Sequence, residues 1–87
     1  MKHAGSAALD ALEPLLAHLR ALPGLAEKSR GVFYSKSKAF LHFHEDPKGL
    51  FADIRAEDGR TFDRFDVTGP EGQARLRAIA EDRLRSR

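Results

Sequence analysis

The chain has 87 residues, of which 41% are hydrophobic and 32% charged, and its 15 basic and 13 acidic side chains leave a formal charge of +2. This length has room for one hydrophobic core, so we expect residues 1–87 to form a single domain, with residues 1–6 flexible. The absence of cysteine excludes disulfides, thiolate metal sites and cysteine nucleophiles. The small net charge does not favour nucleic-acid binding.

The N-terminal region has the pattern of an amphipathic helix over residues 7–21. Its leucines recur at spacings of three and four residues: Leu9, Leu12, Leu15, Leu16, Leu19 and Leu22. Pro14 lacks an amide hydrogen, so the regular helix begins near Asp10 or Glu13 or kinks there. These two acids and Pro14 also interrupt any apolar core of a signal peptide. We therefore expect a cytoplasmic protein without a membrane segment.

From Gly31 to Val67 the pattern changes to alternation between apolar and polar residues, which is typical of strands. We place four strands near residues 31–35, 38–45, 50–56 and 61–67. The run that follows Pro70 predicts a second helix over about 70–85, with the proline in its first turn. The expected fold is α+β: a four-stranded antiparallel meander with both helices on one face, in the order αββββα.

Three turns set the expected register of the strands. Asp58-Gly59 is the signature of a two-residue type I′ hairpin. It predicts the cross-strand pairs Arg55–Phe62, Asp53–Arg64 and Phe51–Asp66. A four-residue loop over Asp46–Gly49 predicts the pairs Glu45–Leu50, His44–Phe51, Phe43–Ala52, His42–Asp53 and Leu41–Ile54. The first hairpin, which turns through residues 35–38, predicts the pairs Tyr34–Ala39, Phe33–Phe40 and Val32–Leu41.

This register divides the strand side chains between two faces of the sheet. The face covered by the helices is expected to hold Val32, Tyr34, Ala39, Leu41, Phe43, Leu50, Ala52, Ile54, Phe65 and Val67. The opposite face, called the open face below, is expected to carry Phe33, Phe40, His42, His44, Phe51, Asp53, Arg55, Phe62, Arg64 and Asp66. Four phenylalanines on one uncovered face predict self-association or a protein or ligand partner.

Two stretches, LRALPGLAEKSRGVFY and KAFLHFHEDPKGLFADIR, resemble a small uncharacterised bacterial family labelled "luciferase family". The resemblance covers about residues 19–55 and places His42, His44, Asp46 and Asp53 on the family's motif. The same helix and hairpin are similar, more loosely, to the MmcQ/YjbR-like family. Its frataxin-like α+β fold implies helices on one face of an antiparallel sheet. Neither resemblance implies an activity.

The residues leave three functions open. The leading hypothesis is a non-enzymatic interaction module that uses the open face and needs no cofactor. The alternative is a metal-binding protein or enzyme, because His42 and His44 point the same way and Asp53 or Asp46 can supply a third ligand. The third is binding of single-stranded nucleic acid by stacking on the open-face phenylalanines, which Asp53 and Asp66 oppose.

His42, Asp53 and Arg64 are expected to form one lateral row across three strands. Directly opposed residues have Cβ atoms about 4.5–5.5 Å apart, so the carboxylate can contact a cation on either side. We therefore expect Asp53 to raise the pKa of His42, with Arg64 competing for the same carboxylate.

Overall fold

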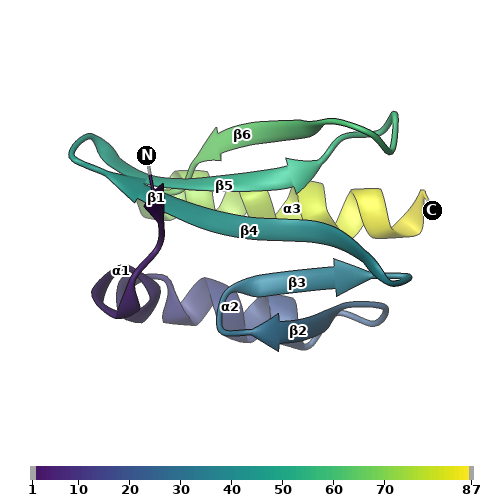
Figure 1. The fold of residues 1–87 in the computed structure, drawn as a ribbon, viewed down its shortest axis with the longest axis horizontal. Helices are drawn as coiled ribbons and strands as arrows, with labels where there is room; N and C mark the ends of the chain where they lie inside the picture. The colour runs from purple at the N-terminus through teal and green to yellow at the C-terminus, as the bar shows by residue number, and fades with distance from the viewer. Residues whose placement is uncertain (1, 87) are drawn as a thin grey trace.

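The computed structural model describes residues 2–86, which form a six-stranded antiparallel sheet and three helices (Figure 1). The elements are β1 (Lys2–His3), α1 (Ser6–Ala11), α2 (Glu13–Arg20), β2 (Ala26–Ser29), β3 (Val32–Ser35), β4 (Lys38–Asp46), β5 (Gly49–Arg55), β6 (Phe62–Asp66) and α3 (Pro70–Arg85). The strand order is β2-β3-β4-β5-β6, and β1 pairs with β4. The α+β class is confirmed, whereas the four-stranded meander is wrong by two strands. No helix within 2–86 is long and apolar enough to cross a membrane.

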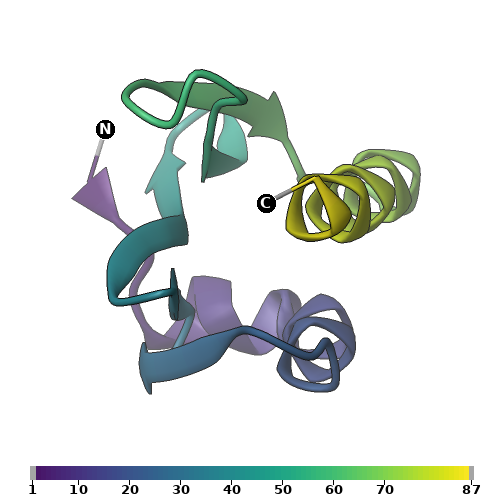
Figure 2. The ribbon, with the colours of Figure 1, turned by 90° about the vertical axis from the view of Figure 1, so that its right-hand side faces the viewer.

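The helices α2 and α3 lie on the same side of the sheet, where they contact each other (Figure 2). The single helix expected over 7–21 is two helices that meet at Leu12, and Pro14 occupies the first turn of α2, where no amide hydrogen is needed. The hydrophobic core lies between the helices and the sheet. Its fully buried large side chains are Leu12, Leu16, Leu19, Phe33, Phe40, Leu41, Ile54, Val67 and Leu76.

The last three strands pair in the expected register. Leu41 lies opposite Ile54, His42 opposite Asp53, and Asp53 opposite Arg64. The loop between β4 and β5 also behaves as expected, because Asp46 pairs with Gly49 across it.

The turn between β5 and β6 keeps this register but differs from the expected type I′ hairpin. Only Gly59 has a positive φ, 74°, and its amide donates to the carbonyl of Ala56. The carboxylate of Asp58 accepts from the amides of Arg60 and Thr61, at 2.8 and 3.0 Å. Hydrogen bonds accepted by the aspartate side chain therefore hold a longer loop that joins the same strand partners.

The first hairpin corrects the assignment of faces. Tyr34 pairs with Ala39 as expected, but Phe33 pairs with Leu41, so Phe40 is an extra residue in β4. The extra residue interrupts the alternation of faces, so β4 keeps its expected faces from Leu41 onward while the side chains of β3 change theirs. Phe33 and Phe40, expected on the open face, are therefore core residues with 1% and 0% of their surface exposed. Val32 and Tyr34, expected in the core, are only half-buried.

Two strands have no signal in the local sequence pattern. β2 reads Ala-Glu-Lys-Ser, has three exposed residues of four, and forms the edge of the sheet. Charged side chains are common on such an edge, where they discourage pairing with another chain. β1 lies within residues 1–6, which we expected to be flexible; its Lys2 and His3 pair with Glu45 and His44.

Candidate metal centre

His42 and His44 project from β4 onto the open face. Their neighbours Leu41 and Phe43 are buried in the core, and alternation along a strand sends the histidines to the opposite side. The two imidazole rings contact each other edge to face, with centroids 4.9 Å apart. Both side chains are half-buried.

A third histidine joins them from the N-terminal strand. His3 pairs with His44, and the amide of Ala4 donates to the carbonyl of Phe43 at 3.1 Å. The His3 ring stacks on that of His44 with centroids 4.8 Å apart and lies 5.9 Å from that of His42. One ring nitrogen from each of the three histidines lies within 4.8 Å of the others. We call these three residues the histidine cluster.

Sequence reasoning missed His3 because its position depends on a gap elsewhere in the sheet. β4 has nine residues and β3 only four, so β3 leaves the second half of one β4 edge unpaired. An unpaired edge is a template for another strand, and β1 occupies it. The predicted strands over 31–35 and 38–45 already differ in length, and this difference was the signal that could have indicated an additional strand.

Asp53 lies beside the cluster but is already engaged through both oxygens. Arg64 binds it in a bidentate arrangement, with both N···O distances 2.7 Å. The Nε2 of His44 lies 3.2 Å from Oδ2 of the same carboxylate. The guanidinium of Arg64 holds the pKa of Asp53 below its ordinary value. Asp53 is thus suited to orient His44 rather than to bind a metal directly, which is a common role for a carboxylate behind a histidine ligand.

Two buried ring nitrogens in the cluster have no hydrogen-bond partner among residues 2–86. Nδ1 of His42 and Nδ1 of His44 make no hydrogen bond within the described part of the chain. Buried polar atoms are normally paired, and an unpaired one costs free energy. Nε2 of His44 lies 3.2 Å from the Asp53 carboxylate, so a neutral ring with its proton on Nε2 keeps a lone pair on Nδ1. That lone pair is available to a metal ion.

The pKa of His42 is shifted in the direction opposite to the one expected from the sequence. Its pKa is lowered, chiefly by burial and then by the neighbouring charge of His44, while Asp53 acts in the other direction. His3 and Arg64 lower it further. The expected rise of the His42 pKa is therefore wrong. The carboxylate across the strand is occupied by Arg64, and the near neighbours of His42 are other imidazoles.

This lowered pKa predicts that the folded protein loses stability on acidification. With its lower pKa, folded His42 binds fewer protons than the unfolded chain, so the free energy of unfolding falls as pH drops from the unfolded pKa to the folded one. The lowered pKa of Asp53 extends this loss to more acidic solution. An NMR titration of the ring protons should place His42 below a histidine in an unfolded reference peptide. A midpoint above the reference would contradict this prediction.

The remaining residues expected at the site lie in different parts of the structure, outside the histidine cluster. Asp46 is not part of the histidine cluster, and its Oδ1 accepts from the amide of Lys48 in the turn. Phe51 is half-buried, while Phe62 is 37% exposed and lies 5.4 Å from the His42 ring. Arg55 stacks over Phe62 at 4.9 Å. With Phe33 and Phe40 in the core, the open face carries half of the expected phenylalanines.

Fold and site together define a small α+β domain whose open sheet face carries a histidine cluster contributed by two paired strands, β1 and β4. No family model matches the chain, and neither the curated proteins nor the solved structures contain a match. The resemblances noted from the sequence stay predictions.

Proposed function

We propose that this domain binds a divalent transition-metal ion through His3, His42 and His44. The observation that carries the proposal is the cluster itself: two strands that are distant in sequence bring one ring nitrogen from each of three histidines within 4.8 Å of the others. The Nδ1 atoms of His42 and His44 support it, because both are buried without a hydrogen-bond partner among residues 2–86 and so remain free to act as donors to a metal ion.

The chemistry of the donors favours zinc or a neighbouring metal. Three imidazole nitrogens without thiolate suit Zn²⁺, Cu²⁺ or Ni²⁺, whereas Ca²⁺ and Mg²⁺ require oxygen ligands. Metal–nitrogen distances of about 2.0–2.1 Å imply nitrogens roughly 3–3.5 Å apart around a tetrahedral ion. The rings must therefore close in slightly. His3 is exposed and belongs to a two-residue strand, so it is the ligand best able to move.

Three protein ligands leave a fourth position for water or an exogenous ligand. The positive charge of Arg64, which would oppose a cation, is compensated by its bidentate contact with Asp53. The interaction module expected from the sequence and the proposed metal site use the same face of the sheet. The metal site depends on histidines, whereas the interaction module depended on four phenylalanines, two of which are in the core.

Calorimetric titration with zinc tests the proposal. We expect one site per chain, and His3→Ala should weaken zinc binding by about 100-fold or more, since even supporting residues of metal sites contribute 10–100-fold. His18→Ala is the matched control, because His18 is exposed on α2 outside the cluster. Zinc should also raise the unfolding temperature of the wild type. Failure of the wild type to bind zinc, or equal losses in both variants, would overturn the proposal.

A further inference from the structure

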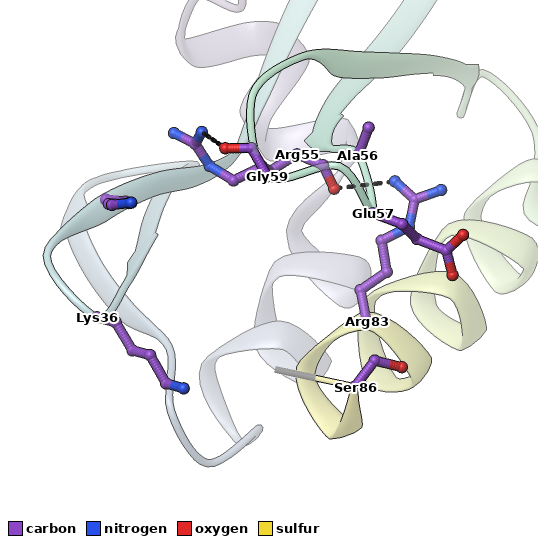
Figure 3. Close-up of a pocket in the computed structure, with 8 residues that line it drawn as sticks. Lys36, Arg55, Ala56, Glu57, Gly59, Arg83 and Ser86 are labelled. Carbon is purple, nitrogen blue, oxygen red and sulfur yellow. Dashed lines mark hydrogen bonds between the residues drawn. The ribbon is translucent and has the colours of Figure 1, made fainter.

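A cavity of about 340 Å³ opens at one end of the sheet, and none of its lining residues belongs to the histidine cluster (Figure 3). It is lined from three sides: the turn between β3 and β4, the end of β5 with its following loop, and the last turn of α3. Four of its lining residues are basic and one is acidic: Lys36, Lys38, Arg55, Arg83 and Glu57. Its composition therefore differs from the nearly balanced charge of the whole chain.

Arg55 is the fixed cation of this cavity. Its Nε donates to the carbonyl of Ala39 at 2.7 Å and its Nη1 to that of Gly59 at 2.8 Å. Among residues 2–86, no carboxylate lies within ion-pair distance of it and its Nη2 has no hydrogen-bond partner, although its charge helps to lower the pKa of the nearby Asp58. Two carbonyls and the Phe62 ring, 4.9 Å away, thus hold its guanidinium in place, and one donor group remains available.

Two lysines from the β3–β4 turn and the start of β4 add further positive charge to the lining of the cavity. Lys36 lies in the β3–β4 turn with φ 54°, and Lys38 begins β4. Both are exposed, and neither forms an ion pair within the described chain. Figure 3 shows Lys36 on the side of the cavity opposite Arg83 and Ser86. An anion between them would meet charge from separate elements.

The other polar groups near the cavity are already engaged, with the exception of Glu57. Arg83 pairs with Asp63 at 2.9 Å and donates to the carbonyl of Arg55 at 3.0 Å (Figure 3). The hydroxyl of Ser86 donates to the carbonyl of Asp82 and so satisfies the end of α3. The nearby Asp58 is held by the amides of its own loop.

We propose that this cavity binds a small phosphate monoester, with Arg55 as the oriented donor and Lys36 and Lys38 as mobile counter-charges. A guanidinium fork matches the oxygens of a phosphate, and lysines bind it as point charges. The volume falls in the range of small-molecule sites. A doubly charged group fits the excess of cations better than a single carboxylate does.

Titration of the full chain with glycerol 2-phosphate, followed by amide NMR shifts, tests this proposal. The shifts should concentrate at Ser37, Gly59 and Ser86 and should saturate, whereas sodium chloride at matched ionic strength should not reproduce them. Lys36→Ala combined with Lys38→Ala should weaken binding about tenfold, and Arg55→Gln about tenfold or more. The lysine pair is exposed, so its replacement remains informative if Arg55→Gln unfolds the protein.

Lys48→Ala is the matched control, because Lys48 lies in the β4–β5 turn at the other end of the sheet (Figure 1). It should leave binding of glycerol 2-phosphate unchanged. Shifts that spread over all basic residues, or an equal loss in the Lys48 variant, would show a non-specific charge effect and overturn the proposal. Saturable binding of inorganic phosphate with the same residue pattern would support it, since the two probes share the phosphate group.

Discussion

Replacement of Phe40 by alanine should lower the free energy of unfolding by about 3–5 kcal/mol, the range for truncation of a buried aromatic side chain. The ring is fully buried, in contact with a core formed by the helices and the sheet. Removal of the ring leaves a cavity that the surrounding side chains fill only in part. The measurement is urea unfolding, in which the midpoint should fall without a change in slope.

Phe62→Ala is the matched control for this prediction. The Phe62 ring is 37% exposed and lies on the open face, against His42 and Arg55. Its truncation should cost about 1 kcal/mol or less, because exposed positions contribute little. If the two variants lost equal stability, or if Phe62→Ala lost more, the bulge at Phe40 and the revised assignment of faces would be wrong.

Gly72→Ala should also destabilise the fold, although alanine is normally the better helix residue by about 0.5–1 kcal/mol. Gly72 lies in the first turn of α3, where a Cβ would be 2.1 Å from the carbonyl oxygen of Asp66. This neighbour is backbone at the end of β6 and cannot rotate away. The helix would have to shift, and overpacking of this kind costs about 1–3 kcal/mol or more.

Gly69→Ala provides the control for Gly72→Ala. Gly69 precedes α3 as its N-cap, has an extended φ of −111°, and has open space where a Cβ would stand. This substitution should cost no more than about 1 kcal/mol, because alanine is a poorer N-cap than glycine but meets no steric clash at this position. In thermal unfolding, each kcal/mol corresponds to about 4–8 °C for a domain of this size. A higher unfolding temperature for Gly72→Ala would contradict the close approach of α3 to β6.

The register of the last three strands could be predicted because short loops set it. Asp46–Gly49 and the loop around Asp58 each fix which residues face each other, and the side-chain alternation then assigns the faces. The cross-strand row of His42, Asp53 and Arg64 follows from these loops alone. The side-chain contacts of this row do not follow from the loops. Register fixes which residues lie opposite each other but not their side-chain rotamers, and it is the rotamers that bring Asp53 into contact with His44 and Arg64.

The leucine pattern likewise predicted the helical region before the sheet, and Pro14 marked where it divides. Such local signals succeed because helix periodicity and the missing proline amide act within one or two turns of the chain. The second helix was predicted with its observed limits for the same reason.

Tertiary structure alone decided the bulge at Phe40 and the pairing of His3. The bulge places Phe33 and Phe40 in the core, where burial of two aromatic rings beneath the helices offsets the disrupted strand pairing. His3 reaches the cluster because β3 is too short to cover β4, which leaves backbone groups that β1 satisfies. Both outcomes depend on contacts between distant segments, and a local sequence pattern contains no information about which distant segment supplies the partner.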